Sequence, residues 1–295
     1  MTEIAASMPR TGKGSLDRFR IGMMLPGALV TFILILFALG LVVFLGFRIN
    51  DGSLTGAGFS LGNFITILTD PLYVTVALRS VAIAGLVTLA TVVTAYPVAY
   101  YLAFHAGRHR SLLLFLVTLP FWTSYLLRVF AWKIVLAYNG VLNSALLGTG
   151  ILSEPSLAFL NTPAAVVVTL AHAYAPFAIL PIFVALETMP KSLVEAAADL
   201  GAKPFTSFRR VILPYSMPGV LAGALVVFVP TVGDYVTPAM VGGPSSTMIG
   251  SLIQAQFGKA NDWPFGAALA VSVMLMILVL ILIVRFADRK FGSRA

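Results

Sequence analysis

Residues 163–186, PAAVVVTLAHAYAPFAILPIFVAL, form a run of 24 residues without a charge. At about 1.5 Å of helical rise per residue, such a run is long enough to cross the roughly 30 Å hydrocarbon core of a bilayer. We interpret it as a membrane-spanning helix. Similar apolar runs elsewhere in the chain then determine the fold.

Five further runs have the length and apolar character of a spanning helix. They are Gly22–Phe47, Ser80–Phe104, Leu112–Ala137, Met217–Val241 and Phe265–Val284. Two of these runs contain charged residues. Leu112–Ala137 contains Arg128 and Lys133, and Met217–Val241 contains Asp234. The sequence therefore predicts an all-α integral membrane protein with six transmembrane helices, the first of them peripheral, and with both termini on one side.

The composition agrees with a membrane protein and excludes several other classes. Of the 295 residues, 59% are hydrophobic and 10% are charged, and the mean hydropathy is +0.97, whereas about a quarter of a soluble domain is charged. The chain has no cysteine, which excludes disulfides, a cysteine nucleophile and thiolate metal sites. Because His105, His109 and His172 lack a helical ligand spacing with a carboxylate, we expect no metal and no cofactor.

Lysine and arginine are distributed unequally between the two sides of the predicted helices. The outer loops contain two, Arg48 and Lys259. The tails and inner loops contain fourteen: Arg10, Lys13, Arg18, Arg20, Arg108, Arg110, Lys191, Lys203, Arg209, Arg210, Arg285, Arg289, Lys290 and Arg294. Short loops rich in these residues remain in the cytoplasm, so both termini are predicted to be cytoplasmic. Topology thus accounts for the net charge of +8, and we expect membrane lipid and no nucleic acid as a partner.

The sequence predicts neither a receptor domain in the outer loops nor a cleavable signal peptide in the first apolar run. The loops Asp51–Gly62, Asn139–Pro163 and Gly242–Trp263 are too short for a folded receptor domain. The first apolar run is longer than the 7–15 residues of a signal-peptide core, and no Ala-x-Ala site follows it. We therefore expect this run to remain as a helix.

The longest inner loop, Glu187–Tyr215, is predicted to form two short helices joined at a glycine. Ser192 and Glu195 have the spacing of a capping box that begins the first helix, and Gly201 follows where a left-handed residue ends it. The prolines expected to begin and end the second helix are Pro204 and Pro214. The predicted apolar faces consist of Leu193, Ala196, Ala197 and Leu200, and of Phe205, Phe208, Val211 and Ile212.

This loop contains a spaced motif that resembles a known family. The motif consists of Glu195-Ala196-Ala197, then Gly201, then Val211-x-Leu213-Pro214. It resembles the EAA loop of binding-protein-dependent ABC importer permeases of type I, with Val211 in place of isoleucine. The resemblance implies a MetI-like permease core whose loop is a coupling helix that docks on the ATP-hydrolysing subunit. The plainer alternatives are that Glu195 only caps its helix and that Gly201 only ends it.

Further segments resemble the spermidine/putrescine permease subunits of that family. They are Asp70–Tyr73, Pro120–Thr123, Gly233–Pro238, Gly242–Pro244 and Asp262–Gly266. This resemblance implies a bacterial inner membrane protein that forms half of a pore for polyamines or a related small solute. The implied partners are two ABC ATPase subunits, a second homologous permease and a periplasmic solute-binding protein.

The same resemblance organises the chain into four segments. They are the cytoplasmic tail 1–20, the first transmembrane helix and periplasmic loop 21–73, the permease core 74–286 with its coupling loop 187–215, and the cytoplasmic tail 287–295. Gly12-Lys13-Gly14-Ser15 lacks the glycine spacing that cradles phosphates, so we expect no ATPase site in this chain. The alternative is a secondary transporter or channel, which requires ionisable residues near the bilayer midplane and no docking loop.

The charges inside the predicted spans are candidates for a translocation pathway. Trp122, Tyr125 and Arg128 are spaced by three and are predicted to share a helix face, at a height comparable with Asp234 and Tyr235. Carboxylate and aromatic rings suit a cationic amine. The alternative is that Arg128 and Lys133 extend to the interface, that Asp234 pairs with one of them, and that the aromatic residues anchor the helices in the membrane.

The predicted topology is testable with a reporter that is active only in the periplasm. Fused after Arg294, the reporter should be silent, because the unequal distribution of lysine and arginine places this end in the cytoplasm. The same reporter inserted in the Asn139–Pro163 loop should be active. Activity after Arg294 would overturn the topology.

Overall fold

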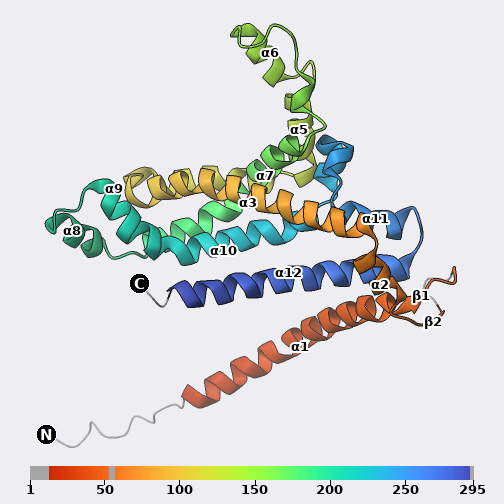
Figure 1. The fold of residues 1–295 in the computed structure, drawn as a ribbon. Coiled ribbons are helices and arrows are strands. Elements are labelled where there is room, and N and C mark those ends of the chain that lie inside the picture. The colour runs from red at the N-terminus through yellow and green to blue at the C-terminus, as the bar shows by residue number, and fades with distance from the viewer. Residues whose placement is uncertain (1–12, 53–56, 293–295) are drawn as a thin grey trace, which may run out of the picture.

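The structure is a computed structural model that describes residues 13–52 and 57–292 (Figure 1). The basic residues Arg10 and Arg294 of the charge count lie outside the described residues, as do the remaining positions of 1–12 and 293–295 in the two predicted tails. A short antiparallel pair, β1 (Arg48–Ile49) and β2 (Ala57–Phe59), follows the first helix. The α-helices are α1 (Lys13–Gly46), α2 (Gly62–Thr69), α3 (Pro71–Phe104), α4 (Arg110–Thr118), α5 (Tyr125–Leu136), α6 (Val141–Gly148), α7 (Pro163–Glu187), α8 (Lys191–Asp199), α9 (Pro204–Ser207), α10 (Leu213–Val232), α11 (Ile249–Gly258) and α12 (Trp263–Gly292).

Shorter helical turns connect these helices. They are the 3₁₀ turns η1 (Gly107–His109), η2 (Leu119–Trp122), η3 (Leu157–Phe159) and η6 (Pro244–Ser246), and the π turns η4 (Phe208–Ile212) and η5 (Pro238–Gly242). Among the described residues, six helical stretches are long and apolar enough to cross a membrane, which confirms the predicted number.

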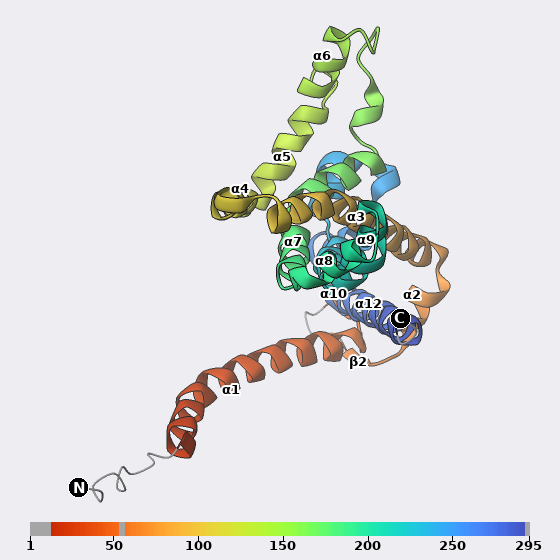
Figure 2. The ribbon, with the colours of Figure 1, turned by 90° about the vertical axis from the view of Figure 1, so that its left-hand side faces the viewer.

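Three helices, α3, α7 and α10, form the centre of the molecule, because they make the most extensive contacts with one another. α12 contacts α11 and α1, and α1 packs mainly on α12, so the first helix is peripheral as predicted (Figures 1 and 2). The start of α1, the end of α12 and the helices α8 and α9 all lie towards one end, and α2, α11 and the β-strands lie at the other (Figure 1).

Small residues allow α7 and α10 to approach each other closely. A Cβ atom added at Gly219 would lie 2.5 Å from the Cβ of Ala185 and 2.6 Å from the carbonyl oxygen of Pro181. A Cβ added at Gly223 would lie 3.2 Å from the backbone of Ala178. Helices in lipid associate through such close packing, because lipid is as apolar as the side chains and adds no hydrophobic driving force.

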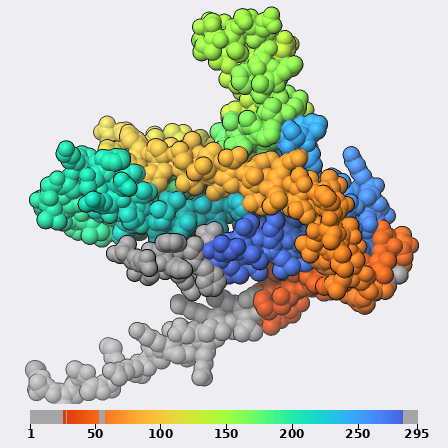
Figure 3. All heavy atoms as spheres, in the orientation of Figure 1, coloured from red at the N-terminus to blue at the C-terminus, as the bar shows by residue number. Residues whose placement is uncertain are grey.

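The third predicted span, Leu112–Ala137, is not one continuous helix. α4 ends at Thr118, η2 follows, and α5 begins only at Tyr125. The break coincides with Pro120, which cannot donate a backbone hydrogen bond and restricts the residue before it. As a result α5 and α6 project away from the central helices as an arm (Figures 2 and 3), and the spanning stretch found here is Tyr125–Gly148.

The fifth predicted span, Met217–Val241, also differs from the structure at both ends. Helical structure begins earlier, at Pro204, and α10 ends at Val232. Asp234 and Tyr235 lie in a non-helical break, after which the chain turns again in η5. Gly233 and the flanking prolines explain the break, since proline removes donors from the helical ladder. Irregular backbone at membrane depth is tolerated where protein covers it.

The α7–α10 contact gives a prediction about stability. Gly219→Ala should lower the unfolding free energy by about 1–3 kcal/mol, because its Cβ overpacks a rigid helix contact. Gly85→Ala is the matched control, since an added Cβ there meets no atom within 4 Å. Denaturant unfolding of the purified chain measures both variants, and equal stability would contradict the packing account.

Candidate functional site

The α8–α9 loop, residues 188–212, and the start of α10 contain the first group of predicted site residues. α8 ends in a left-handed glycine: Gly201 has a φ of +79°. Its N–H donates to the carbonyl of Ala198 at 2.8 Å, and the N–H of Ala202 donates to the carbonyl of Ala197 at 3.0 Å. These two bonds form a Schellman motif, which satisfies the last carbonyls of the helix. The predicted glycine bend is confirmed.

Two details of the predicted loop are wrong. The N-cap of α8 is Pro190, with no side-chain capping bond, so Ser192 lies inside the first turn and forms no capping box with Glu195. Pro214 does not end a helix. It lies in α10, directly after the π turn η4, within a helical stretch that continues from Pro204 to Val232.

The base of the α8–α9 loop is attached to the helical bundle. The ring of Phe208 packs edge-on against Tyr96 of α3, with ring centroids 5.7 Å apart. Ile212 is buried, and the hydroxyl of Tyr215 donates to the carbonyl of Thr188 at 3.3 Å. An ion pair between Arg110 and Glu187 adds a contact between α4 and the end of α7. The loop is therefore held at both of its ends.

The tip of the α8–α9 loop is exposed and apolar. Leu200 is 89% exposed and Phe205 is 73% exposed, on either side of the Gly201 bend. Glu195 and Ala196 are also exposed, while Val211, Leu213 and Pro214 lie at the attached base. A large apolar side chain that is fully exposed at the end of a loop is typical of a surface that another protein covers.

The second group of site residues lies around Asp234, at the opposite end of α10. The Asp234 side chain is buried, with 8% exposure. Its Oδ2 accepts a hydrogen bond from the Tyr125 hydroxyl at 2.7 Å, and its Oδ1 accepts one from the N–H of Val236 at 3.0 Å. The Tyr125 hydroxyl is also 2.6 Å from Oγ1 of Thr237. We call Tyr125, Asp234 and Thr237 the Asp234 cluster.

Arg128 does not form the alternative ion pair with Asp234. Its Nη1 donates instead to the carbonyl of Ala173 in α7 at 2.8 Å, and its buried Nε has no partner in the described structure. Lys133 is exposed on α5. Within the described residues, Asp234 therefore has only uncharged hydrogen-bond donors.

Two other predicted pathway residues lie apart from this cluster. Trp122 belongs to the η2 turn before α5, so the spacing by three does not place it on the α5 face with Tyr125; its side chain is 79% exposed. Tyr235 follows Asp234 directly but lines a cavity beside α11. The third span is not one continuous helix, and this accounts for the separation of Trp122 from the α5 face of Tyr125.

Sequence reasoning missed two sets of residues. Thr237 was included in a motif but not assigned to the site, although its hydroxyl completes the Asp234 cluster. Gln254, Phe257 and Trp263 also line the cavity beside Tyr235. Trp263 was part of the motif Asp262–Gly266 but was not assigned to the site, whereas only proximity in the fold identifies Gln254 and Phe257. Among the described residues no three His, Cys, Asp or Glu side chains gather as metal ligands.

Comparison with known proteins places the chain in a family. The family model described as binding-protein-dependent transport system inner membrane component matches residues 95–293. The spermidine/putrescine transport system permease protein PotB of Escherichia coli K12 is 41% identical over 223 residues, which are 76% of this chain and 80% of the relative. The inner membrane ABC transporter permease protein YdcU of Escherichia coli K12 is 37% identical over 220 residues, 70% of this chain and 69% of the relative.

Solved structures share the fold. A bacterial ABC transporter involved in the import of the acidic polysaccharide alginate matches with a TM-score of 0.70 at 16% identity, over 95% of this chain and 99% of that one. The methionine ABC transporter MetNI, in an inward-facing conformation, matches with a TM-score of 0.53 at 20% identity, over 77% and 98%. With its six helices and family motif, the chain belongs to the binding-protein-dependent transport system inner membrane components, the multi-pass permease subunits of bacterial ABC importers.

Proposed function

We propose that this permease subunit conducts polyamines such as spermidine and putrescine, or a related small cation. The observation that carries the proposal is the Asp234 cluster, in which a buried carboxylate is held by neutral donors and has no basic partner among the described residues. An ammonium group passing this point gains a charge interaction in a medium of low dielectric constant. The polyamine permease named above supports the same substrate class.

We further propose that the α8–α9 loop is the cytoplasmic coupling loop, with both termini on the same side. The exposed Leu200 and Phe205 and the glycine bend between them offer an apolar tip that fits a cleft of an ATPase subunit. The working complex would contain this chain, a second permease, two ATPase subunits and a periplasmic binding protein. In this arrangement ATP is hydrolysed by the partners and not by this chain.

The segment division proposed from the sequence agrees with this role. The core 74–286 contains the loop, the Asp234 cluster, the helices α7 and α10, and all of α3 except its first three residues. α7 and α10 flank the loop directly, so a force applied at the loop acts on two helices that pack closely against each other. A secondary transporter or channel has no use for an exposed apolar loop of this kind, and we favour ATP-coupled import.

The coupling role predicts the effect of a charge at the glycine bend. Gly201→Glu should abolish energy-dependent uptake while the permease remains in the membrane, because a side chain strains a backbone with a φ of +79° and obstructs docking. Gly107→Glu is the matched control: that glycine has a φ of +48° and open space, and lies outside the loop. Uptake and co-purification of the ATPase subunits measure the effect. Normal uptake by Gly201→Glu would refute the coupling role.

The pathway role predicts the effect of removing one charge. Asp234→Asn should slow polyamine uptake about tenfold or more, the equivalent of at least about 1.4 kcal/mol in the barrier, with normal assembly of the complex. Asp234→Glu should retain more uptake than Asp234→Asn. Arg128→Gln should not rescue Asp234→Asn, because the two side chains are not paired. Rescue in the double variant, or full uptake by Asp234→Asn, would contradict the proposal.

A further inference from the structure

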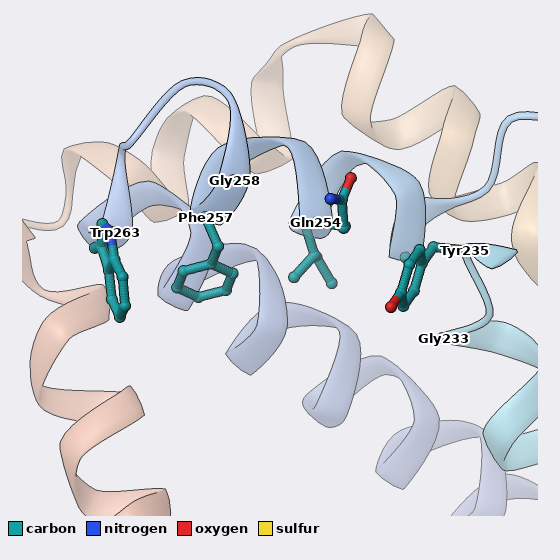
Figure 4. A pocket seen from close by; sticks show the side chains of 8 residues that line it. Gly233, Tyr235, Gln254, Phe257, Gly258 and Trp263 are labelled. Carbon is teal, nitrogen blue, oxygen red and sulfur yellow. The ribbon is translucent and has the colours of Figure 1, made fainter. Parts of the chain in front are cut away.

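A cavity of about 520 Å³ lies between α11, the α10 break and the start of α12. It is an open hollow on the surface of the chain and not an enclosed chamber. The side chains of Tyr235, Phe257 and Trp263 project towards the same side of α11 (Figure 4). Ile253 and Gln254 lie between them in the lining, and the remaining lining residues are Gly233, Gly250 and Gly258. The cavity thus has aromatic rings towards its two ends and an aliphatic side chain between.

Two of the rings, Phe257 and Trp263, are held against each other, and Trp263 and Tyr235 remain partly exposed. Phe257 and Trp263 form an edge-to-face pair with centroids 5.5 Å apart. The indole N–H of Trp263 donates to Oδ1 of Asn261 at 3.1 Å, which fixes the orientation of the ring. Trp263 is 36% exposed and Tyr235 is 47% exposed. Exposed aromatic faces attract an ammonium or alkylammonium group.

The position of the cavity connects it with the Asp234 cluster. Tyr235 and Asp234 are adjacent in the chain, yet Asp234 contacts α5 while Tyr235 faces α11. The backbone of Gly233 and Asp234 packs on Gly250 of α11, so the cavity and the Asp234 cluster lie on opposite sides of this short segment. Among the described residues no carboxylate lines the cavity, so its ring faces are the groups that a cation would meet there.

We propose that this cavity binds the alkylammonium groups of the substrate beside the Asp234 cluster. The inference rests on the proposed function. The substrate class is an alkyl chain with an ammonium group at each end. The ammonium groups lie against Tyr235 and against the Phe257–Trp263 pair, and the methylene groups lie along Ile253. An ethanolamine lipid headgroup has the same chemistry and is the alternative source of the ligand.

Fluorination of Phe257 tests the inference, because fluorine withdraws charge from the ring face with little change in shape. The complex, without its binding protein, is placed in nanodiscs of phosphatidylglycerol and a neutral glycolipid, and binding of radiolabelled putrescine is measured after subtraction of empty nanodiscs. Affinity should fall stepwise from monofluoro- to trifluorophenylalanine, by about 3- to 10-fold in total. The same series at Phe64, at the same end of the molecule but outside the cavity, should have no effect.

The outcomes separate the inference from the proposed function. If the unmodified complex transports polyamines but fluorination of Phe257 leaves putrescine binding unchanged, the cavity assignment is wrong and the function remains. If the unmodified complex neither binds nor transports polyamines, both fail. A third outcome is tested in nanodiscs that contain phosphatidylethanolamine. If the unmodified complex retains that lipid, the trifluoro variant loses it and putrescine binding is unchanged, the cavity binds a lipid headgroup. That result would overturn the substrate role.

Discussion

Backbone contact between α7 and α10 is the constraint on which the rest of this structure depends. In lipid, two apolar helices gain no hydrophobic energy from meeting, so their association relies on surfaces that fit closely. Gly219 and Gly223 remove side chains where Ala185, Pro181 and Ala178 approach. Larger residues at these positions would separate the helices and displace both segments attached to them.

Those segments are the two candidate sites. The α8–α9 loop joins the near ends of α7 and α10, and the Asp234 cluster begins two residues beyond the far end of α10. α7 also supplies Ala173, whose carbonyl holds Arg128 and thereby the helix of Tyr125. A pair of closely packed helices therefore connects the loop with the carboxylate, and the coupling proposed above requires that movement at the loop be transmitted along it.

Much of this arrangement could be predicted from the sequence, and the exceptions have physical causes. Uncharged runs identify six spans because backbone groups in lipid must be satisfied within a helix, and Gly201 is predictable because few other residues adopt its conformation. The break at Pro120 and the break after Val232 were not predicted, since each lies in a run that is long and apolar enough to be one spanning helix. Asp234 contacts Tyr125 and not Arg128, because Arg128 bonds a backbone carbonyl of α7, and that choice has no signal in local spacing.

The central claim, that the loop and the Asp234 cluster are mechanically connected, can be tested in a chain that has no cysteine of its own. A single cysteine in place of Val236, which is half-buried beside Asp234, reports access to the cluster through its rate of labelling by a membrane-impermeant thiol reagent. In the assembled complex this rate should differ between the nucleotide-free and vanadate-trapped states, and the difference should vanish when Gly201→Glu is added. Equal labelling rates in the two states with an intact loop would contradict the account.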